Sequence, residues 1–327
     1  MNTRLRSLLT LTALSLGAMG TGRAVNSFLP RRLATWYEPQ EAAVHKDSTS
    51  FPKVDISFLR CGSVSVPELI AVRGAFSLAP RLISHSAVLV RHPKATFLYD
   101  TGMCMDISLY MRDQSFFFRN VLGKFSFEQS LSSHLQYLDM KPGDLDFALI
   151  SHLHWDHVSG VPDIPGVPLR INRVEYDAAQ QSSLVQHHNL PRQLMGDNPV
   201  ELFDCSGPSY EGFHSSHDLL GDGSVVLVPL PGHTAGNTGM FINRSNGSRL
   251  FLLGDAAWVS ENYLRPATMH PFIWSAVTSD DATACQTLID LHHFSHRHPE
   301  IVLIAMHDAQ AQESFMKVEK SSMAHVR

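Results

Sequence analysis

The sequence predicts an α/β fold in which stacked β-sheets are flanked by helices. Segments with strand character outnumber segments with helical character in both halves of the chain. Strands and helices therefore do not alternate one for one, as they would in a doubly wound parallel sheet. The composition, with 44% hydrophobic and 17% charged residues among 327, is typical of a globular protein and does not shift along the chain. We therefore expect one folded domain over residues 53–327.

The first 24 residues have the pattern of a secretory signal peptide. Arg4 and Arg6 give a basic start, and an apolar run follows from Leu8 to Gly20. Gly22 and Ala24 fit the small-residue positions before a cleavage site. The apolar run is short for a bilayer span, so we expect export to the periplasm or the medium, without stable membrane insertion after cleavage. An amphipathic first helix and an uncleaved anchor are the alternatives.

Short apolar runs bounded by turn residues predict the strands that follow. Residues 25–52, which contain prolines and basic residues in no regular pattern, are expected to form an irregular N-terminal arm before them. The expected strands are Val54–Leu59, Ala87–Val90, Thr96–Tyr99, Phe147–Ile150, Leu169–Asn172, Val225–Leu230, Gly239–Asn243, Leu250–Leu253 and Ile301–Ala305. The second and third of these are joined by a short turn and are expected to pair as a hairpin.

Apolar residues at helical spacing predict three helices. The first covers Phe127–Leu138, where Leu131 and Leu135 continue the apolar face and Ser126 is placed to cap the helix. The other two are expected at Val174–Leu184 and Asp281–His296.

Charge and cysteine content narrow the choice of partners and compartments. The formal net charge is −5 and no block of like charges occurs, so a nucleic-acid partner, which needs a basic stripe, is not expected. The cysteines lie far apart without CxxC spacing, at Cys61, Cys104, Cys205 and Cys285. Disulfides by any of three connectivities remain open, but small buried side chains are the favoured interpretation.

Histidine is the unusual residue type, with 19 copies, and the segment Ser151–Gly160 concentrates it. The segment reads HxHxDH and directly follows the expected strand Phe147–Ile150. In an extended backbone, an HxH pair directs two imidazoles to the same side. Neutral imidazole and carboxylate are the usual nitrogen and oxygen ligands of Zn²⁺ and similar ions. The sequence therefore predicts a metal site at the end of this strand.

Three later segments repeat the design in which an apolar strand ends in a metal-ligand type. Val225–Leu230 leads into His233, Leu250–Leu253 leads into Asp255, and Ile301–Ala305 leads into His307. Each of these residues alone is more often an ordinary loop residue. Their shared position after a strand, downstream of HxHxDH, predicts that all three join the same site.

Taken together, these motifs resemble the metallo-β-lactamase superfamily. HxHxDH, the GHT loop, the GD pair and the late His match its five-motif pattern, and Asp100-Thr101-Gly102 matches its upstream DTG. The resemblance covers Val54 to Gln310. It implies a four-layer αββα sandwich, with two β-sheets face to face, helices outside, and the metal site at one edge of the sheets.

The same resemblance implies a ligand set for two divalent metal ions, most simply Zn²⁺. The ligands of the first ion would be His152, His154 and His233. Those of the second would be Asp156, His157 and His307. Asp255 would be the carboxylate that bridges the two ions.

Asp255 also indicates a branch of the superfamily. The true β-lactamases lack this bridging residue, so antibiotic hydrolysis is not expected. The local sequences Asp255-Ala256-Ala257 and His307-Asp308 resemble those of the N-acyl homoserine lactonase group. Two departures stand out. Trp258 occupies the position of a Tyr that assists the substrate carbonyl in that group, and the loop His233–Asn237 lacks the Pro and second His of many relatives.

These residues imply hydrolysis of a small-molecule ester or lactone such as an N-acyl homoserine lactone. Two ions about 3.5–4 Å apart can share a hydroxide and lower the pKa of its parent water toward ~7. That hydroxide would attack the carbonyl carbon. Asp156 would carry a proton to the leaving group, and Asp255 would hold both ions, so these are the expected catalytic residues.

The substrate contacts are expected from the long segment between Asp255 and His307. Trp258, Tyr263 and His270 are the candidate residues there. The aromatic residues Trp155, Phe272 and Trp274 either form an apolar wall beside Trp258 or belong to the core.

Two other interpretations of the motifs remain. The same metal pair can serve an organophosphate or phosphodiester hydrolase. A non-catalytic protein that binds metal or a small ligand is the alternative from another class. It is disfavoured because degenerate members of the superfamily normally lose ligands, whereas this chain keeps all seven.

Overall fold

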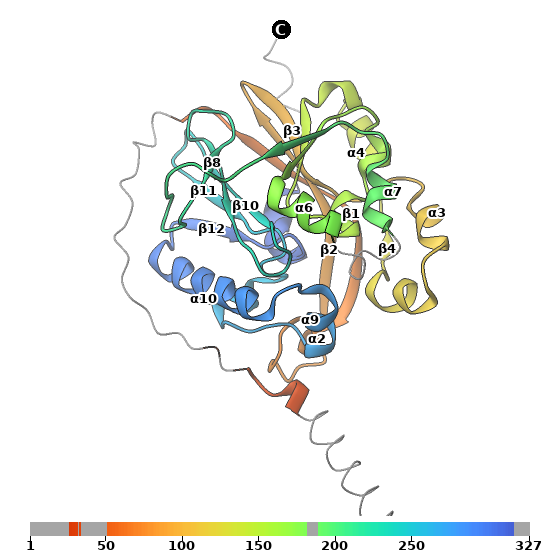
Figure 1. Ribbon diagram of the computed structural model, residues 1–327, viewed down its shortest axis with the longest axis vertical. Helices are drawn as coiled ribbons and strands as arrows, with labels where there is room; N and C mark the ends of the chain where they lie inside the picture. Colours follow the sequence, from red (N-terminus) through yellow and green to blue (C-terminus); the bar gives the residue numbers. More distant parts are fainter. Residues whose placement is uncertain (1–25, 32, 34–50, 182–188, 317–327) are drawn as a thin grey trace, which may run out of the picture.

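Two β-sheets, each covered by helices on its outer face, make up the computed structural model (Figure 1). The structure describes residues 26–31, 33, 51–181 and 189–316. The expected signal peptide, residues 1–24, and most of the expected arm lie outside these ranges.

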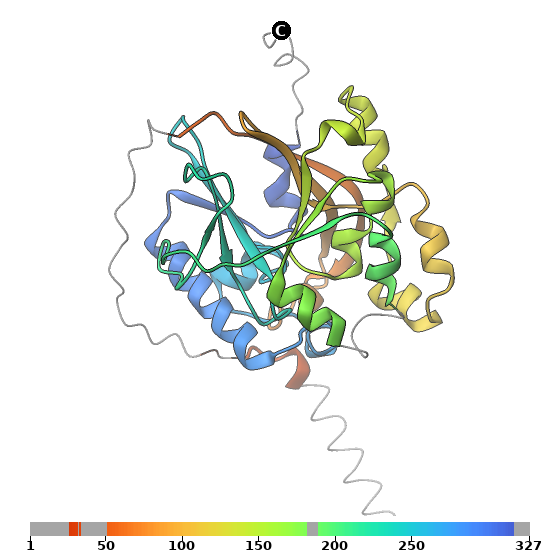
Figure 2. The ribbon, with the colours of Figure 1, turned by 45° about the horizontal axis from the view of Figure 1, so that its top comes forward.

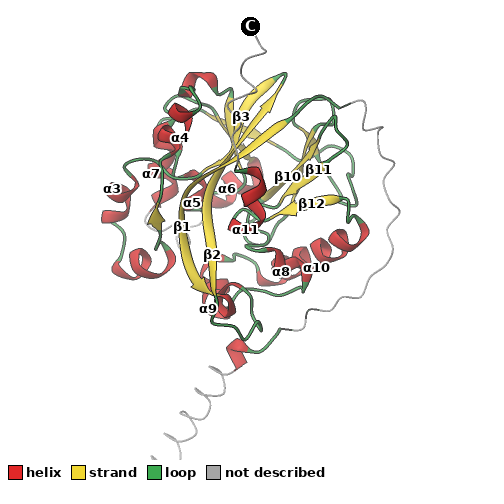
Figure 3. Cartoon of the chain, turned by 180° about the vertical axis from the view of Figure 1, so that it is seen from behind, coloured by secondary structure: helices red, strands yellow, loops and turns green. Residues whose placement is uncertain are grey.

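The first sheet has seven strands in the order β4-β1-β2-β3-β5-β6-β7. Its strands are β1 (Asp55–Pro67), β2 (Pro80–His92), β3 (Ala95–Thr101), β4 (Ser126–Phe127), β5 (Phe147–Ile150), β6 (Leu169–Asn172) and β7 (Val200–Phe203). The strands β1, β2 and β3 pair antiparallel, and β3, β5, β6 and β7 pair parallel. The long strands β1 and β2 run through most of the molecule (Figure 3).

The second sheet has five strands in the order β12-β11-β10-β9-β8. Its strands are β8 (His217–Asp218), β9 (Val225–Pro229), β10 (Thr238–Asn243), β11 (Arg249–Leu252) and β12 (Ile301–Ile304). Only β11 and β12 pair parallel in this sheet.

Helices cover the outer faces of both sheets. The α-helices are α2 (Glu68–Ala71), α3 (Ile107–Arg112), α4 (Leu131–Tyr137), α5 (Trp155–Val158), α6 (Arg173–Gln181), α7 (Leu190–Met195), α8 (Ser260–Leu264), α9 (Pro271–Val277), α10 (Asp281–Arg297) and α11 (Ala309–Gln312). Shorter turns of other helix types are η2 (Phe118–Leu122), η3 (Pro142–Asp144), η4 (Val161–Asp163) and η6 (Glu313–Phe315). The blue helix α10 lies outside the cyan strands of the second sheet, opposite the yellow-green helices of the first (Figure 2).

Side-chain alternation along the strands builds three layers of apolar packing. In β2, Leu89 packs beneath the helices of the first sheet, whereas Val88 and Val90 pack against the second sheet. On the far side, Leu288 and Phe294 of α10 pack on the second sheet. The predicted αββα sandwich is confirmed, because each sheet has one face in the central layer and the other beneath helices.

All nine predicted strands are present, and the predicted hairpin is the antiparallel pair β2–β3. The boundaries of the first predicted helix were wrong. Helix α4 starts at Leu131, and the Oγ atom of Ser130, not Ser126, accepts the capping hydrogen bond from the Ser133 amide. Ser126 instead belongs to β4, which pairs with β1, because β-pairing satisfies its backbone before the helix begins.

The four cysteines carry free thiols, with Cys61, Cys104 and Cys285 buried and Cys205 half-buried. Three of the four thus fit the favoured interpretation of small buried side chains. Within the described ranges, none of the helices has the length and apolar character that a bilayer crossing would require.

Candidate metal centre

The predicted ligands meet where four strands of the two sheets end. His152, His154, Asp156 and His157 follow β5 of the first sheet, while the other three follow β9, β11 and β12 of the second. Strand ends place side chains accurately because the hydrogen-bonded sheet fixes the last residue of each strand. The site therefore lies on the line where the two sheets meet.

The first half-site consists of His152, His154 and His233. One nitrogen of each ring lies within 4.8 Å of the others and of a carboxylate oxygen of Asp255. The His233 Nε2 atom is 2.9 Å from the His154 Nδ1 atom and 3.3 Å from Asp255 Oδ2. The His152 Nε2 atom is 3.9 Å from the same oxygen. Three imidazoles thus converge on one face of Asp255.

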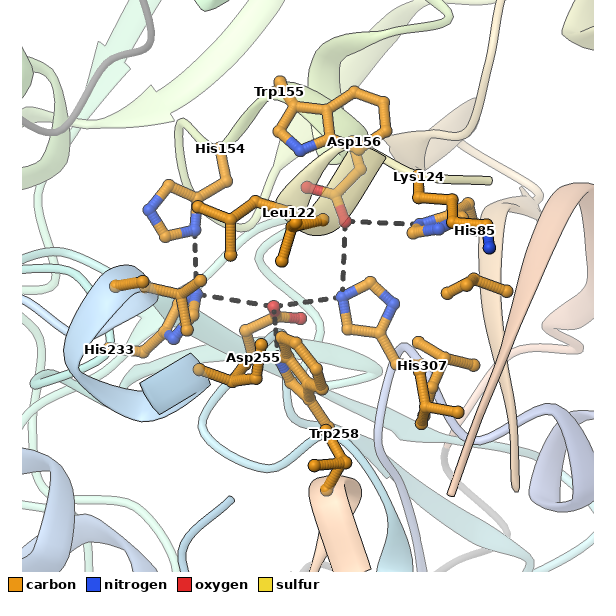
Figure 4. A pocket seen from close by; sticks show the side chains of 18 residues that line it. His85, Leu122, Lys124, His154, Trp155, Asp156, His233, Asp255, Trp258 and His307 are labelled. Carbon is orange, nitrogen blue, oxygen red and sulfur yellow. Dashed lines mark hydrogen bonds and ion pairs between the residues drawn. The ribbon is translucent and has the colours of Figure 1, made fainter. Parts of the chain in front are cut away.

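The second half-site consists of Asp156, His157 and His307. The His157 Nε2 atom is 3.3 Å from Asp255 Oδ1, and the His307 Nε2 atom is 3.1 Å from Asp255 Oδ2. Asp156 Oδ2 lies 3.4 Å from His307 Nε2. Asp255 therefore contacts both half-sites, which is the position of a bridging ligand (Figure 4).

The upstream DTG motif supports the second half-site. Asp100 is fully buried, and its Oδ2 atom lies 2.7 Å from His157 Nδ1. The amide and hydroxyl of Ser151 both donate to this carboxylate, at 2.8 Å each. Asp100 has a positive φ of 54°, an uncommon conformation for a residue with a side chain. The contact with Asp100 directs the His157 Nε2 atom to the metal centre.

The other supporting contacts come from the backbone and from a buried glutamate. The His307 Nδ1 atom donates to the Ser84 carbonyl at 2.7 Å, which leaves its Nε2 atom facing the centre. Glu175 of α6 accepts hydrogen bonds from the Leu153 and Gly236 amides at 2.8 and 2.9 Å. This carboxylate therefore joins the HxHxDH loop to the GHT loop.

The loop that lacks the usual Pro and second His is held by Asn237. Its Nδ2 atom donates to the carbonyls of Leu230 and Leu253, and its Oδ1 atom accepts from the Asp255 amide at 3.2 Å. Gly254 has a φ of 54°, and a Cβ there would lie 2.3 Å from Asn237 Oδ1. The turn that presents Asp255 therefore requires glycine.

Burial lowers the pKa of every imidazole in the first half-site. The pKa falls to about 3 for His154 and about 4 for His233, and that of His152 lies well below its ordinary value. Repulsion between neighbouring imidazoles acts in the same direction. These rings are neutral in the metal-free protein, and neutral imidazole is the form that binds a metal ion.

The imidazoles of the second half-site behave in the opposite way. Burial alone would lower the pKa of His157, but Asp255, Asp100 and Asp156 outweigh it and raise that pKa well above its ordinary value. The carboxylates of Asp255 and Asp156 likewise outweigh burial and raise the pKa of His307. In return, His307 and His157 overcome the effect of burial and hold the pKa of Asp255 well below its usual range. A metal ion at this half-site would replace protons.

The donor atoms fit a metal ion better than they fit one another. Among the described residues, four buried atoms at the centre have no hydrogen-bond partner: His152 Nε2, His157 Nε2, His233 Nδ1 and Asp255 Oδ1. A buried polar atom left unpaired costs about 1–3 kcal/mol. Three of these four atoms, all except His233 Nδ1, face the other predicted ligands. Their nitrogen and oxygen chemistry suits Zn²⁺ and similar divalent ions.

An apolar pocket opens onto the metal centre. Its walls come from β1, α2, β2, the segment around η2, and α9, through Val64, Val66, Ile70, Ile83, Val121, Leu122, Ile273, Ala276 and Val277. Next to the pocket, Phe117 and Phe272 meet edge to face with ring centroids 6.0 Å apart. The pocket thus combines a polar floor with walls suited to an apolar chain.

The structure places only one of the three predicted substrate residues in this pocket. Trp258 lines it, and its Nε1 atom donates to Asp255 Oδ2 at 3.0 Å. Tyr263 is buried beneath α10, where its hydroxyl donates to the Leu303 carbonyl at 3.3 Å. His270 caps α9 and contacts Ser27 of the N-terminal arm. The structure therefore does not bring Tyr263 or His270 into this pocket, because both side chains make their contacts outside it.

The four aromatic residues expected at a wall or in the core divide between these places. Trp155 and Trp258 line the pocket. Trp274 is buried against the second sheet, and Phe272 is half exposed.

Sequence reasoning missed His85, which lines the pocket from β2. Its Nδ1 atom lies 3.2 Å from Asp156 Oδ2. In the sequence His85 stands between two serines, before the apolar run Ala87–Val90 that predicted the strand, so no pattern there indicated a site residue. Sequence reasoning also assigned no role to Asp100 or Glu175, although the DTG motif had singled out Asp100.

The chain is similar to known proteins of one superfamily. The model of the metallo-β-lactamase superfamily matches residues 80–285. A probable metallo-hydrolase of Mycobacterium tuberculosis is 25% identical over 79% of this chain and 81% of its own length. An N-acyl homoserine lactonase of Rhizobium radiobacter is 23% identical over 70% of this chain and 83% of its own length.

Solved structures show the same fold. An N-acyl homoserine lactone hydrolase with N-hexanoyl-L-homoserine at its catalytic metal centre superposes with a TM-score of 0.61 and 18% identity, over 80% of this chain and 96% of that one. A dizinc quorum-quenching lactonase superposes with a TM-score of 0.53 and 16% identity, over 78% and 88% of the two chains. At these identities the likeness is one of fold.

Proposed function

This chain belongs to the metallo-β-lactamase superfamily and is a metallo-hydrolase, and we propose that it hydrolyses a carboxylic ester or lactone at a centre of two divalent ions. The proposed substrates resemble N-acyl homoserine lactones, and Zn²⁺ is the proposed ion. We also propose that the protein acts after export to the periplasm or the medium.

The position of Asp255 is the observation that supports two ions over one. Its carboxylate contacts His233 of the first half-site and His307 of the second, at 3.3 and 3.1 Å. Each half-site also contains two further predicted ligands of its own. A single ion would leave a buried nitrogen of the other half-site, His152 Nε2 or His157 Nε2, without a hydrogen-bond partner, at a cost of about 1–3 kcal/mol.

The residues divide the chemistry between them. When bound, the two ions supply Lewis acidity and make hydroxide available near neutral pH. Asp255 holds the two half-sites together, and the Trp258 N–H steadies its Oδ2 atom. Asp156 lines the pocket with its side chain 11% exposed, where its carboxylate would accept the proton of the attacking hydroxide and pass it to the departing alkoxide oxygen. The apolar walls bind the acyl chain and keep bulk water from the polar floor.

Two features support an ester with an apolar acyl chain. The pocket walls are aliphatic, and the relatives with 23–28% identity include several N-acyl homoserine lactonases. Trp258 does not take over the carbonyl contact of the Tyr in that group, because its N–H is donated to Asp255. The bound ions would then have to polarise the substrate carbonyl without help from a side chain at this position.

Lys124 favours a second candidate substrate class. Its exposed side chain lines the pocket and offers a positive charge to an anionic substrate. A phosphodiester would match this charge, with the same ligand set below it.

Hydrolysis by the purified protein, with metal content measured on the same sample, tests the proposal. The panel sets N-acyl homoserine lactones of several chain lengths and aryl esters against phosphotriesters, phosphodiesters and a cephalosporin. We expect two ions per chain, with the highest kcat/KM on a lactone or ester. Phosphoester turnover alone would select the second candidate, and metal binding without turnover on any substrate would contradict hydrolysis.

A further inference from the structure

Strand β2 contributes two successive residues to the second half-site. The Ser84 carbonyl accepts the hydrogen bond of His307 Nδ1 at 2.7 Å. The next side chain, His85, faces the pocket, whereas the Ser84 hydroxyl points away and donates to Gln312 Oε1 at 2.9 Å. This is the alternation expected along a strand. The family motifs do not include either residue, yet both touch the side chains that those motifs predict.

His85 is a buried histidine whose close polar neighbour is a predicted metal ligand. It is 6% exposed, and its Nδ1 atom lies 3.2 Å from Asp156 Oδ2. The contact is close but poorly aligned, and neither ring nitrogen has a well-formed hydrogen bond among the described residues. Its ring lies between Trp155 and His307, with centroid distances of 5.7 and 5.3 Å. A buried imidazole with no well-formed hydrogen bond costs free energy, and the carboxylate of Asp156 lies within reach of its Nδ1 atom.

The two carboxylates of the centre each have a ring nitrogen beside them from outside the seven predicted ligands. For Asp255 this is the Trp258 Nε1 atom, at 3.0 Å. For Asp156 it is His85 Nδ1. Figure 4 shows both contacts, with Trp258 directed at Asp255 and His85 directed at Asp156 on the opposite side of His307. Metal-binding carboxylates normally need such partners to fix their orientation.

Its distance from the bridging carboxylate distinguishes His85 from the predicted ligands. His157, Asp255 and His307 bring their donor atoms within 4.8 Å of one another. His85, Asp156 and His307 form a second group that is equally close, but among the described residues His85 belongs to no group that contains Asp255. His85 therefore lies on the side of Asp156 that faces away from the bridging carboxylate.

We propose that His85 is a positioning residue, which fixes the orientation of the Asp156 carboxylate through its Nδ1 atom. This inference rests on the proposed function only in its assumption that Asp156 binds a metal ion. Asp156 has one oxygen, Oδ2, facing both His85 and His307, and the other 4.0 Å from His157 Nε2. If His85 holds Oδ2, the carboxylate cannot rotate about its terminal bond. Both its metal contact and its proton transfer then keep one geometry.

Two substitutions at this position distinguish the contribution of the Nδ1 atom from that of the planar ring. His85→Phe keeps a planar ring in the wall but removes both nitrogens. His85→Asn places an amide close to the former Nδ1 position. His92→Phe is the matched control, because it makes the same change at another buried histidine of β2, which contacts Ser224 and Asp222 instead of the metal centre.

Cobalt(II) replaces the native ion as a spectroscopic probe in this experiment, so the main readout requires no substrate. In His85→Phe we expect an altered visible absorption band and a 10–100-fold weaker affinity for the second Co²⁺ ion, as other partners of metal ligands show. In His85→Asn the absorption band and the Co²⁺ affinity should lie closer to those of the unsubstituted protein. In His92→Phe both should be unchanged. On whichever substrate the parent hydrolyses, His85→Phe should lower kcat more than it changes KM.

Two results would overturn the inference. A parental cobalt spectrum and affinity in His85→Phe would make His85 a wall residue only. Loss of one ion per chain in both His85→Phe and His85→Asn would make it a metal ligand. Because cobalt binding is measured without substrate, neither result depends on whether the ester or lactone assignment is correct.

Discussion

In the first half-site imidazoles lie against one another, whereas in the second each imidazole lies against a carboxylate. His233 and His154 place two ring nitrogens 2.9 Å apart. His157, by contrast, has Asp100 on one side at 2.7 Å and Asp255 on the other at 3.3 Å. His307 likewise faces Asp255. The same ligand types therefore sit in two different electrostatic surroundings.

This difference decides whether the imidazoles of each half-site must lose a proton before they can bind a metal ion. Burial keeps the pKa of His154 and His233 low, so these rings need lose no proton. The carboxylates hold protons on His157 and His307 by raising their pKa values. The second half-site gains more from a metal ion electrostatically but must first release protons, which makes its affinity depend more on pH.

Removal of Asp255 should have the largest effect, because it is the one residue that both half-sites share. In Asp255→Ala we expect both ions to bind more weakly and kcat/KM to fall by about a thousandfold or more, since several kcal/mol of stabilisation are lost. Metal analysis and kinetics on the same sample measure this. The exposed Asp197→Ala is the control. Loss of an ion from one half-site alone would show that Asp255 is not shared.

Acid should empty the second half-site before the first. As pH falls through the raised pKa values of His157 and His307, above the ordinary value of about 6.5, protons compete with the ion there. The first half-site should hold its ion until the pH approaches about 4, the pKa of His233. Dialysis at stepped pH followed by metal analysis should show a plateau near one ion per chain. Simultaneous loss of both ions would contradict the contrast.

Substitution of Asp100 should weaken only the second half-site. Asp100→Asn would turn an amide N–H toward His157 Nδ1, so that the ring carries its proton on Nε2, the atom needed for the metal ion. We expect about a 10–100-fold loss of affinity for one ion and little change for the other. Titration calorimetry with Zn²⁺ resolves the two events. Equal weakening of both would mean that Asp100 acts through the whole fold.

Trp258→Phe should have the smallest effect of the series. It keeps a ring against His307 but removes the N–H donated to Asp255. A hydrogen bond to a charged group contributes about 1.5 kcal/mol, which corresponds to about a tenfold fall in kcat. Tyr263→Phe is the matched control, because it removes one hydroxyl donor outside the pocket and should leave kcat unchanged. A larger fall in kcat for Tyr263→Phe than for Trp258→Phe would indicate that Tyr263 contacts the substrate.

The strands and the ligands that follow them could be predicted because a short stretch of sequence is enough to identify both. Phe147–Ile150 is apolar at every position and ends directly before HxHxDH, and β5 has these same bounds. The cap of α4 shows the limit of local patterns. Both Ser126 and Ser130 suit a cap, and the choice between them depends on the pairing of β4 with β1, which the segment itself does not encode.

The pocket residues could not be predicted in the same way. Tyr263 and Trp258 lie close together in the sequence, but helix α8 turns Tyr263 toward α10 and leaves Trp258 at the centre. His85 precedes Asp156 by about 70 residues and meets it only because β2 and β5 lie in the same sheet. Contacts of this kind arise from packing between strands, for which the sequence around His85 gives no spacing signal.

Titration of the metal-free protein with Zn²⁺, with lactone and aryl-ester hydrolysis followed at each step, tests the central claim most directly. If two half-sites joined by Asp255 carry out the reaction, activity should stay low through the first equivalent and rise to a plateau at the second. Full activity at one equivalent, or in the metal-free protein, would contradict the account.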